Sequence, residues 1–557
     1  MSIFTHIPNR ITKTTVALGL TVVFILGSSY QTGRKDLVQL ENAYLPELSH
    51  ALKGFLSDSG LMLSSDKLYG EALQAHAGVK EFYAANGYIP VWTFYNNLNS
   101  KATGVLQLLA QARDFGLEPE NYHLEALNML QQQLASKERR KDYPELRKQT
   151  ELLLTDAVLC FMLNLQQGYP NVTADSMAAR RDNIVGTFQQ AIQDDHTAEG
   201  ILSVQPAFVE YKQLQLATRN YLRTVDLTRE WIGISSVSED SVRFRDEVRQ
   251  VLIRLGYLAA GAGDGTTEGL MRFQRYHGLE PDGKPGKNTL DALHLTALYH
   301  YRLLVLNLDR LRKQDNSNPN MLYVNIPAFT LKVFDNNKLH DTYRVIVGKP
   351  DSPTPRLTSA IERIIANPNW HVPSKISRNE ILPKLKSDST YLKRNRFRLL
   401  DENNNTVKAE DLNFDEMSAA DFNFKLQQDA GSDNALGQVK FIFANPYAVY
   451  LHDTPGKTLF NKDIRAFSHG CIRVQNPGKL AGYIAAVAHS DSINIAGLIA
   501  TGHHHEIRLA KTMPIHIRYI TCEADANGGL YFYRDIYGID EKELAALEPF
   551  RITERVR

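Results

Sequence analysis

One of the three cysteines in the chain lies in a polar, glycine-containing stretch, "FSHGCIRV". A cysteine nucleophile needs a thiolate, a nearby base or cation, and donors for the oxyanion that forms in acyl transfer. Cys471 has His469 two positions before it and Arg473 two positions after it. We therefore expect thiol chemistry at Cys471. "LTDAVLCFMLNL" predicts instead that Cys160 belongs to a core, and "RYITCEAD" predicts a structural strand position for Cys522.

A second histidine can reach the same cysteine from a strand. "QVKFIFANPYAVYLHD" predicts a hairpin with Asn445-Pro446 at its turn. Tyr450 and His452 share one face of its second strand, because strand side chains alternate. The 15 residues "DTPGKTLFNKDIRAF" then form an excursion that can return to place Cys471 beside His452. We predict His452 as the base, with His469 as the rival, because a strand-held imidazole is better oriented.

The loop around the cysteine offers further groups. Gly470 lets the backbone turn so that the amides of residues 470 and 471 point together. Arg473 could hold a substrate carboxylate in bidentate fashion, or could form a structural ion pair. Ser468 and His469 are expected to shape the site, and the carbonyl or hydroxyl of Tyr450 could orient His452. Asn-Pro at 476–477 predicts a helix start whose dipole could lower the pKa of the thiol.

Several ordered motifs resemble one enzyme family. His452, its spacing and "SHGCIRV" resemble the signature of the L,D-transpeptidases, with Asp453 where many members have glycine. "VGKPDSPTP", "ANPNWHVP" and "NALGQVKF" resemble the family's preceding segments, and together the motifs cover roughly 320–530. The whole chain resembles the large Gram-negative members.

The resemblance implies a reaction on peptidoglycan. Cys471 would attack the carbonyl of diaminopimelate, the third residue of a tetrapeptide stem, and release D-Ala. The amine of a second diaminopimelate would resolve the thioester and form a 3→3 cross-link, without cofactor or metal; sensitivity to carbapenems is also implied. Resolution by water would make the enzyme an L,D-carboxypeptidase. A cell-wall-binding protein with an inactive catalytic domain is a further alternative.

A compact helical unit is predicted at residues 240–296. "FRDEVRQVLIRLGYL" places apolar residues on one helical face and ends at Gly256, and "DGTTEGLMRFQRYHGL" and "DGKPGKNTLDAL" predict two more helices. The unit resembles the three-helix peptidoglycan-binding domain. One departure, "DGTTEG", leaves open whether the unit binds glycan or serves only as a scaffold.

The remaining sequence divides into a leader, a helical region and a β-rich region. Arg10 and Lys13 precede an uncharged apolar stretch in residues 1–35, which predicts an uncleaved membrane anchor or a cleaved signal. Residues 36–235 predict a helical scaffold, and 318–535 a β-rich catalytic domain. The insertion 374–432 predicts a lid, or else a solvated basic face; it contains six basic residues: Lys384, Lys386, Lys393, Arg394, Arg396 and Arg398.

Composition limits the partners. Of the 557 residues 43% are hydrophobic, which supports several packed domains, and a net charge of +1 gives no electrostatic reason to expect nucleic acid. "HHHE" at 503–506 predicts a surface loop, because consecutive residues do not easily converge on one metal. We expect a multidomain α plus mainly-β protein in the periplasm, anchored in the inner membrane or secreted. Its expected partners are stem peptides, glycan strands and cell-wall synthesis proteins.

Overall fold

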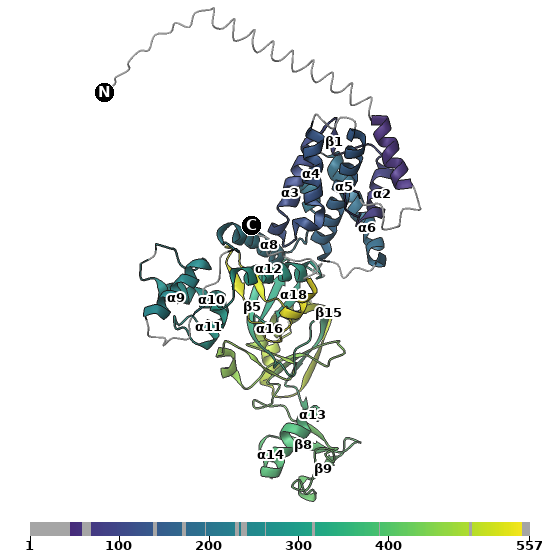
Figure 1. Cartoon of the computed structure of the whole chain (residues 1–557). Helices are drawn as coiled ribbons and strands as arrows, with labels where there is room; N and C mark the ends of the chain where they lie inside the picture. Colours follow the sequence, from purple (N-terminus) through teal and green to yellow (C-terminus); the bar gives the residue numbers. More distant parts are fainter. Residues whose placement is uncertain are drawn as a thin grey trace, which may run out of the picture. The chain divides into compact units, whose positions relative to one another are not determined.

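The computed structural model describes residues 45–57, 68–136, 142–169, 174–194, 196–228, 233–234, 242–261, 263–314, 318–388, 390–488 and 493–547. The chain divides into two compact units at Pro206 and Ala207 (Figure 1). The predicted anchor or signal at 1–35 lies outside the described residues. Within the ranges above, no helix is both long and apolar enough to cross a membrane.

The first unit is helical, as predicted, and is centred on one buried helix. Its helices are α2 (His76–Ala85), α3 (Ser100–Ala110), α4 (Leu124–Ala135), α5 (Tyr143–Gln167), α6 (Ala174–Gln193) and α7 (Thr197–Leu202). Helix α5 is buried along most of its length and includes Cys160, whose predicted core position is confirmed. The buried Glu151 carboxylate on α5 accepts backbone N–H bonds from Val91, Trp92 and Thr93, which fixes that loop.

The second unit begins with α8 (Val209–Thr224) and a three-helix module. Helices α9 (Val242–Arg254), α10 (Thr266–Tyr276) and α11 (Lys287–Leu293) enclose one apolar core. The predicted helix end at Gly256 is confirmed, and its φ of +78° is the left-handed geometry that favours glycine there. Helix α12 (Ala297–Arg312) then leads to the β-rich region.

The β-rich region is a closed sheet. Its strands are β3 (Met321–Asn325), β4 (Thr330–Asp335), β5 (Lys338–Gly348), β6 (Leu357–Ala366), β11 (Val439–Phe443), β12 (Leu451–His452), β13 (Ala466–Ser468), β14 (Ile472–Val474) and β15 (His505–Arg518). The strand order is β13-β5-β14-β12-β11-β6-β15-β3-β4, and a further β4–β5 pairing closes the sheet into a barrel.

Local sequence explains two turns of this barrel. The β4–β5 hairpin turns at Asn336 and Asn337, both with positive φ, as the two-residue turn of a twisted hairpin requires. The predicted β11–β12 hairpin is confirmed, and the Asn445 side chain ties its loop together by bonding the backbone of Phe443 and Val449. Helix α16 (Pro477–Ala488) begins at the predicted Pro477 and packs on the barrel core, with α17 (Ile495–Ala500) beside it.

The chain beyond β15 forms a small C-terminal segment. It contains β16 (Cys522–Ala524), β17 (Leu530–Phe532) and α18 (Asp540–Leu547). Cys522 is fully buried on β16, in agreement with its predicted structural strand position. Helix α18 packs against α12.

The insertion folds around its own core. A four-stranded sheet in the order β7 (Trp370–His371), β10 (Lys425–Gln428), β8 (Phe397–Leu400), β9 (Thr406–Val407) packs with α13 (Ser374–Ile376), the π-turn η4 (Ser377–Ile381), α14 (Leu382–Ser387) and α15 (Tyr391–Arg394). Three of its predicted basic residues form ion pairs with nearby acids: Arg394 with Asp388, Arg396 with Asp433, and Arg398 with Asp429. Its positive charge is therefore partly neutralised.

Candidate active site

Cys471 lies directly before β14, where the predicted excursion returns to its starting strand. β12 and β14 pair in parallel, with Leu451 opposite Ile472 and His452 opposite Arg473. The backbone N–H of Ile472 donates to the carbonyl of Tyr450 at 3.1 Å. The pairing therefore brings Cys471 beside Tyr450, two positions before His452.

A row of basic side chains crosses the sheet at this point. On one side of His452 lies Arg473 of β14, and on the other lies Lys440 of β11, which pairs with His452 in antiparallel register. Residues in register across neighbouring strands project to the same face. The Lys440 ammonium also lies 3.8 Å from the centre of the Tyr450 ring, a cation–π contact.

The surroundings of Cys471 have opposing effects on its thiol. Burial raises the pKa of Cys471, and hydrogen bonds from the backbone and hydroxyl of Tyr450 and the charges of Lys440 and Arg473 lower it in part. Burial also raises the pKa of the Tyr450 phenol, so Tyr450 stays a hydrogen-bond donor. The resting cysteine is consequently a neutral thiol whose thiolate is stabilised by one hydroxyl and two cations.

His452 is buried and uncharged. Burial lowers its pKa to about 3, and the charges of Arg473 and Lys440 act in the same direction. Its Nδ1 has no hydrogen-bond partner in the described part of the chain, so a ring nitrogen is available for proton transfer. The backbone of Asp453 and of Leu436 acts in the opposite direction and raises the pKa of His452 in part.

Tyr450, a candidate to orient His452, has other polar partners. Its carbonyl accepts the Ile472 N–H and its hydroxyl bonds the thiol of Cys471, while its ring meets the His452 ring edge-on at 5.6 Å.

Asp453, the residue after His452, has a structural role. Its buried carboxylate accepts the Gln438 N–H at 3.0 Å and pairs with Lys457. The adjacent Gly437 has a φ of +59°, and a Cβ there would come within 2.3 Å of the carboxylate. Asp453 thus braces the turn that leads into β11 and Lys440.

The loop before the cysteine is held by side-chain hydroxyls. Ser468 donates to the carbonyl of Cys471 and accepts the N–H of Gly470 at 3.2 Å. The Gly470 N–H is therefore already bonded within the loop, which leaves the Cys471 N–H as the donor of the predicted pair. Gly470 does have a positive φ, +107°, as its predicted role in the turn requires.

His469 contacts the insertion, which argues against a role as the base. Its Nε2 lies 2.6 Å from a carboxylate oxygen of Glu380, on the π-turn η4. The side chain is about one-third exposed, unlike that of His452. The two histidines nearest the cysteine thus have different partners and different solvent access.

Lys440, Glu380 and Thr354 were not predicted as site residues. Lys440 and Thr354 lie in stretches quoted for the family resemblance, and Glu380 lies in the predicted insertion. Thr354 is in "VGKPDSPTP", and its hydroxyl donates to the Gly470 carbonyl at 2.8 Å. Lys440 is in "NALGQVKF". Lys440 could have been noticed as the one charged residue in an otherwise apolar strand. No local feature of the sequence distinguishes Glu380 or Thr354.

Metal ligation finds no support in the described ranges, which contain no group of three or more histidine, cysteine or acidic side chains able to hold an ion. In the "HHHE" stretch His505 begins β15, and Glu506 pairs with Arg363 at 2.9 Å. The stretch is therefore partly a strand and not only a surface loop.

Three family models match the chain. They are described as "L,D-transpeptidase catalytic domain" for residues 319–500, "Scaffold domain" for 77–217 and "Putative peptidoglycan binding domain" for 244–293. Residues 319–500 form an L,D-transpeptidase catalytic domain. The resemblance seen in the sequence, including the peptidoglycan-binding module, is confirmed.

A curated relative supports the assignment. The "Putative L,D-transpeptidase" of Haemophilus influenzae is 31% identical over 239 residues, which is 43% of this chain and 48% of the relative. The chain thus spans about half the length of that relative. A solved L,D-transpeptidase from Mycobacterium smegmatis aligns over 36% of this chain and 58% of its own, at 15% identity and a TM-score of 0.18.

Proposed function

We propose that this protein cross-links peptidoglycan as a cysteine L,D-transpeptidase. The observation that carries the proposal is the grouping in the catalytic domain of Cys471 with the Tyr450 hydroxyl, two cations and a neutral imidazole on the neighbouring strand. This set supplies a nucleophile, a proton acceptor and positive charge for an anionic substrate.

The first half-reaction acylates the enzyme. The thiol proton of Cys471 passes to His452 as sulfur bonds to the diaminopimelate carbonyl carbon. The carbonyl oxygen becomes an oxyanion, toward which the Cys471 backbone N–H can donate. Collapse of the tetrahedral intermediate breaks the C–N bond, and D-Ala leaves with the proton from His452.

The second half-reaction forms the cross-link. The side-chain amine of another diaminopimelate attacks the thioester, and its proton passes through His452 to the departing sulfur. The new amide is the 3→3 cross-link, and the thiol is restored. Water in place of the amine would give a tripeptide, which is the L,D-carboxypeptidase alternative.

Charge at the site suits the donor stem. Arg473 and Lys440 are both partly buried, and burial lowers the pKa of each, since an unpaired cation there is poorly solvated. A stem carboxylate would restore a partner for these cations, and a guanidinium can bind it with two hydrogen bonds. The peptidoglycan-binding module would hold the glycan strand. A protein that acts on peptidoglycan would work outside the cytoplasm, and the location that we propose is the periplasm.

The decisive experiment is product analysis by mass after incubation with a disaccharide-tetrapeptide. Loss of D-Ala with a dimeric product is expected, whereas a tripeptide monomer alone would assign hydrolysis. Cys471→Ser should abolish both products, because a base suited to a thiol rarely deprotonates a hydroxyl. The control variant Cys522→Ser should keep its activity per folded molecule, since Cys522 is buried on β16 outside the site. Unchanged substrate would support a cell-wall-binding protein instead.

A further inference from the structure

A buried threonine connects the nucleophile loop to strand β5. The Thr354 hydroxyl donates to the carbonyl of Gly470 at 2.8 Å and accepts the N–H of Gly348 at 2.9 Å. Thr354 is 3% exposed. One hydroxyl therefore fixes the carbonyl that belongs to the same peptide plane as the Cys471 N–H.

A tyrosine from the C-terminal segment holds this threonine in place. The Tyr537 hydroxyl donates to the carbonyl of Gly348 at 2.7 Å and accepts the backbone N–H of Thr354 at 3.1 Å. Gly348 permits this close packing, because a Cβ there would lie 2.2 Å from the Ser352 carbonyl oxygen. Tyr537 thus bonds both backbone segments that meet at Thr354.

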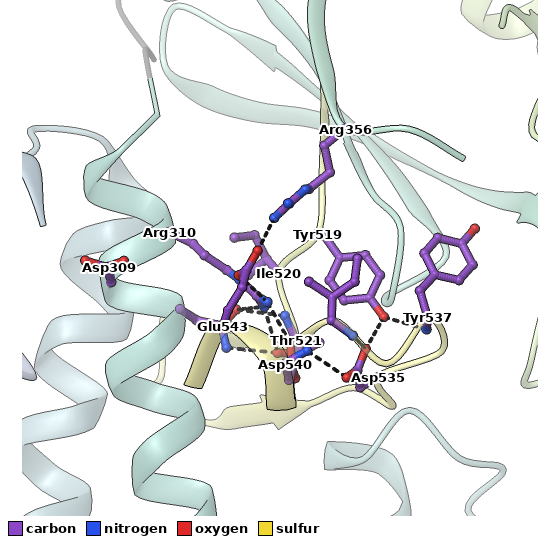
Figure 2. A network of polar contacts seen from close by, with 12 residues as sticks. Asp309, Arg310, Arg356, Tyr519, Ile520, Thr521, Asp535, Tyr537, Asp540 and Glu543 are labelled. Carbon is purple, nitrogen blue, oxygen red and sulfur yellow. Dashed lines mark hydrogen bonds and ion pairs between the residues drawn. The ribbon is translucent and has the colours of Figure 1, made fainter. Parts of the chain in front are cut away.

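The tyrosine is itself held by a polar network (Figure 2). Its N–H donates to the Tyr519 hydroxyl at 2.9 Å, and that hydroxyl donates to Asp535. Asp535 also accepts the N–H groups of Ile539 and Asp540. Asp540 is in turn paired with Arg310 of α12 at 2.8 Å, so the network is anchored on a second helix.

We propose that Thr354 and Tyr537 are positioning residues that aim the Cys471 N–H at the oxyanion. The peptide unit is rigid, so a fixed Gly470 carbonyl fixes the direction of the opposite N–H. This N–H matters more here because the Gly470 N–H is bonded to Ser468. The proposal rests on the proposed acyl transfer and extends the active site to residue 537, outside the matched catalytic domain at 319–500.

The proposal can be separated from simple bracing of the fold by two reactions of the same thiol. Acylation by a carbapenem or by the tetrapeptide stem creates an oxyanion and needs the directed N–H. Alkylation by iodoacetamide displaces iodide at a saturated carbon and creates none. If Thr354 and Tyr537 position the Cys471 N–H, substituting them slows acylation alone. If they only brace the fold, substituting them loosens the loop and alters both reactions.

The variants are Thr354→Val, Thr354→Ser and Tyr537→Phe in the full chain. Removal of one oxyanion donor costs roughly 10²–10³-fold, so misdirecting it through Thr354→Val should slow acylation by about 10–100-fold. Tyr537→Phe should slow it less, by about 3–10-fold, because the Thr354 hydroxyl remains. Thr354→Ser should recover most of the rate, and the double variant Thr354→Val/Tyr537→Phe should be little worse than Thr354→Val. Alkylation should be unchanged throughout.

The matched control is Tyr323→Phe. It removes a buried hydroxyl that has no hydrogen-bond partner among the described residues, and it lies outside the site. It should leave acylation unchanged. Equal losses in acylation and alkylation, or multiplicative losses in the double variant, would overturn the positioning role.

Failure of the proposed function has a different signature. A wild-type protein that is acylated by the carbapenem but turns over no stem peptide refutes the transpeptidase assignment and still permits the positioning test. A wild-type protein that is alkylated but never acylated refutes both proposals.

Discussion

Two sides of the nucleophile are built differently. On the strand side, His452 and Tyr450 are buried or nearly so and are bound by barrel backbone and by the thiol itself. On the loop side, the side chain of His469 is partly exposed and pairs with Glu380 of the insertion. The contrast separates groups fixed by the barrel from groups that depend on a second folded body. It suggests chemistry on the strand side and substrate access on the loop side.

The largest effect should distinguish the two histidines. His452→Ala should lower kcat/KM for acylation by about 10²–10⁴-fold, the usual cost of losing a general base. His469→Ala should cost less than about 10-fold, because its ring is committed to Glu380 and not to the thiol. Stopped-flow acylation by a carbapenem measures both. The opposite ranking would move the base to the loop side.

Deleting the insertion should give the next largest effect. A short Gly/Ser bridge from Ser374 to Asp433 should weaken donor binding and raise the ratio of hydrolysis to cross-linking, because a lid excludes water from the thioester. Product masses and the KM of the tetrapeptide give the two readouts, and iodoacetamide should still reach the thiol. An unchanged rate and product ratio would show that the insertion is a solvated basic face and not a lid.

The strand side can be probed by pH. Alkylation of Cys471 should rise through an apparent pKa above the ordinary thiol value of about 8.5, because burial raises its pKa. His452, with its pKa lowered to about 3, should give no inflection between pH 5 and 8. Lys440→Met should move the profile to still higher pH, since it removes a cation that lowers the pKa of the thiol. The exposed Lys462→Met is the control. A rate already at its plateau at pH 6 would refute a neutral resting thiol.

The smallest effect on activity is expected for the contact between Glu380 of the insertion and His469 of the nucleophile loop. Glu380→Gln should change the KM of the stem by no more than about fivefold, because the contact between Glu380 and His469 is partly exposed and such contacts contribute little. Glu416→Gln, another exposed acid of the insertion, should have no effect. A large loss in kcat would indicate that Glu380 takes part in the chemistry.

The sequence predicted what depends on local periodicity. Strand alternation put Tyr450 and His452 on one face, and the excursion length allowed the return of Cys471. The partners that tune the site came from pairings distant in sequence. Lys440 joins His452 through strand register, Glu380 reaches His469 through the packing of an inserted subdomain, and Tyr537 reaches Thr354 from 183 positions away.

The positive charge of the insertion was overestimated from the sequence. Its basic residues were counted as a cluster, whereas Asp388, Asp429 and Asp433 stand close enough in the fold to pair with three of them. Counting one sign of charge in a segment overstates its field when acids within the segment or further along the chain fold against it.

Strand β5 has a consequence for how the protein opens. Its first part pairs with β4, and its last residues lie between β14 on one side and β13 on the other. A closed sheet has no free edge in this stretch from which to fray. The amide protons of Val345 and Val347, bonded to the carbonyls of Phe329 and Arg465, should exchange with deuterium only when the whole barrel unfolds. The strand that pairs with β14, next to Cys471, would then be among the slowest-exchanging parts of the chain.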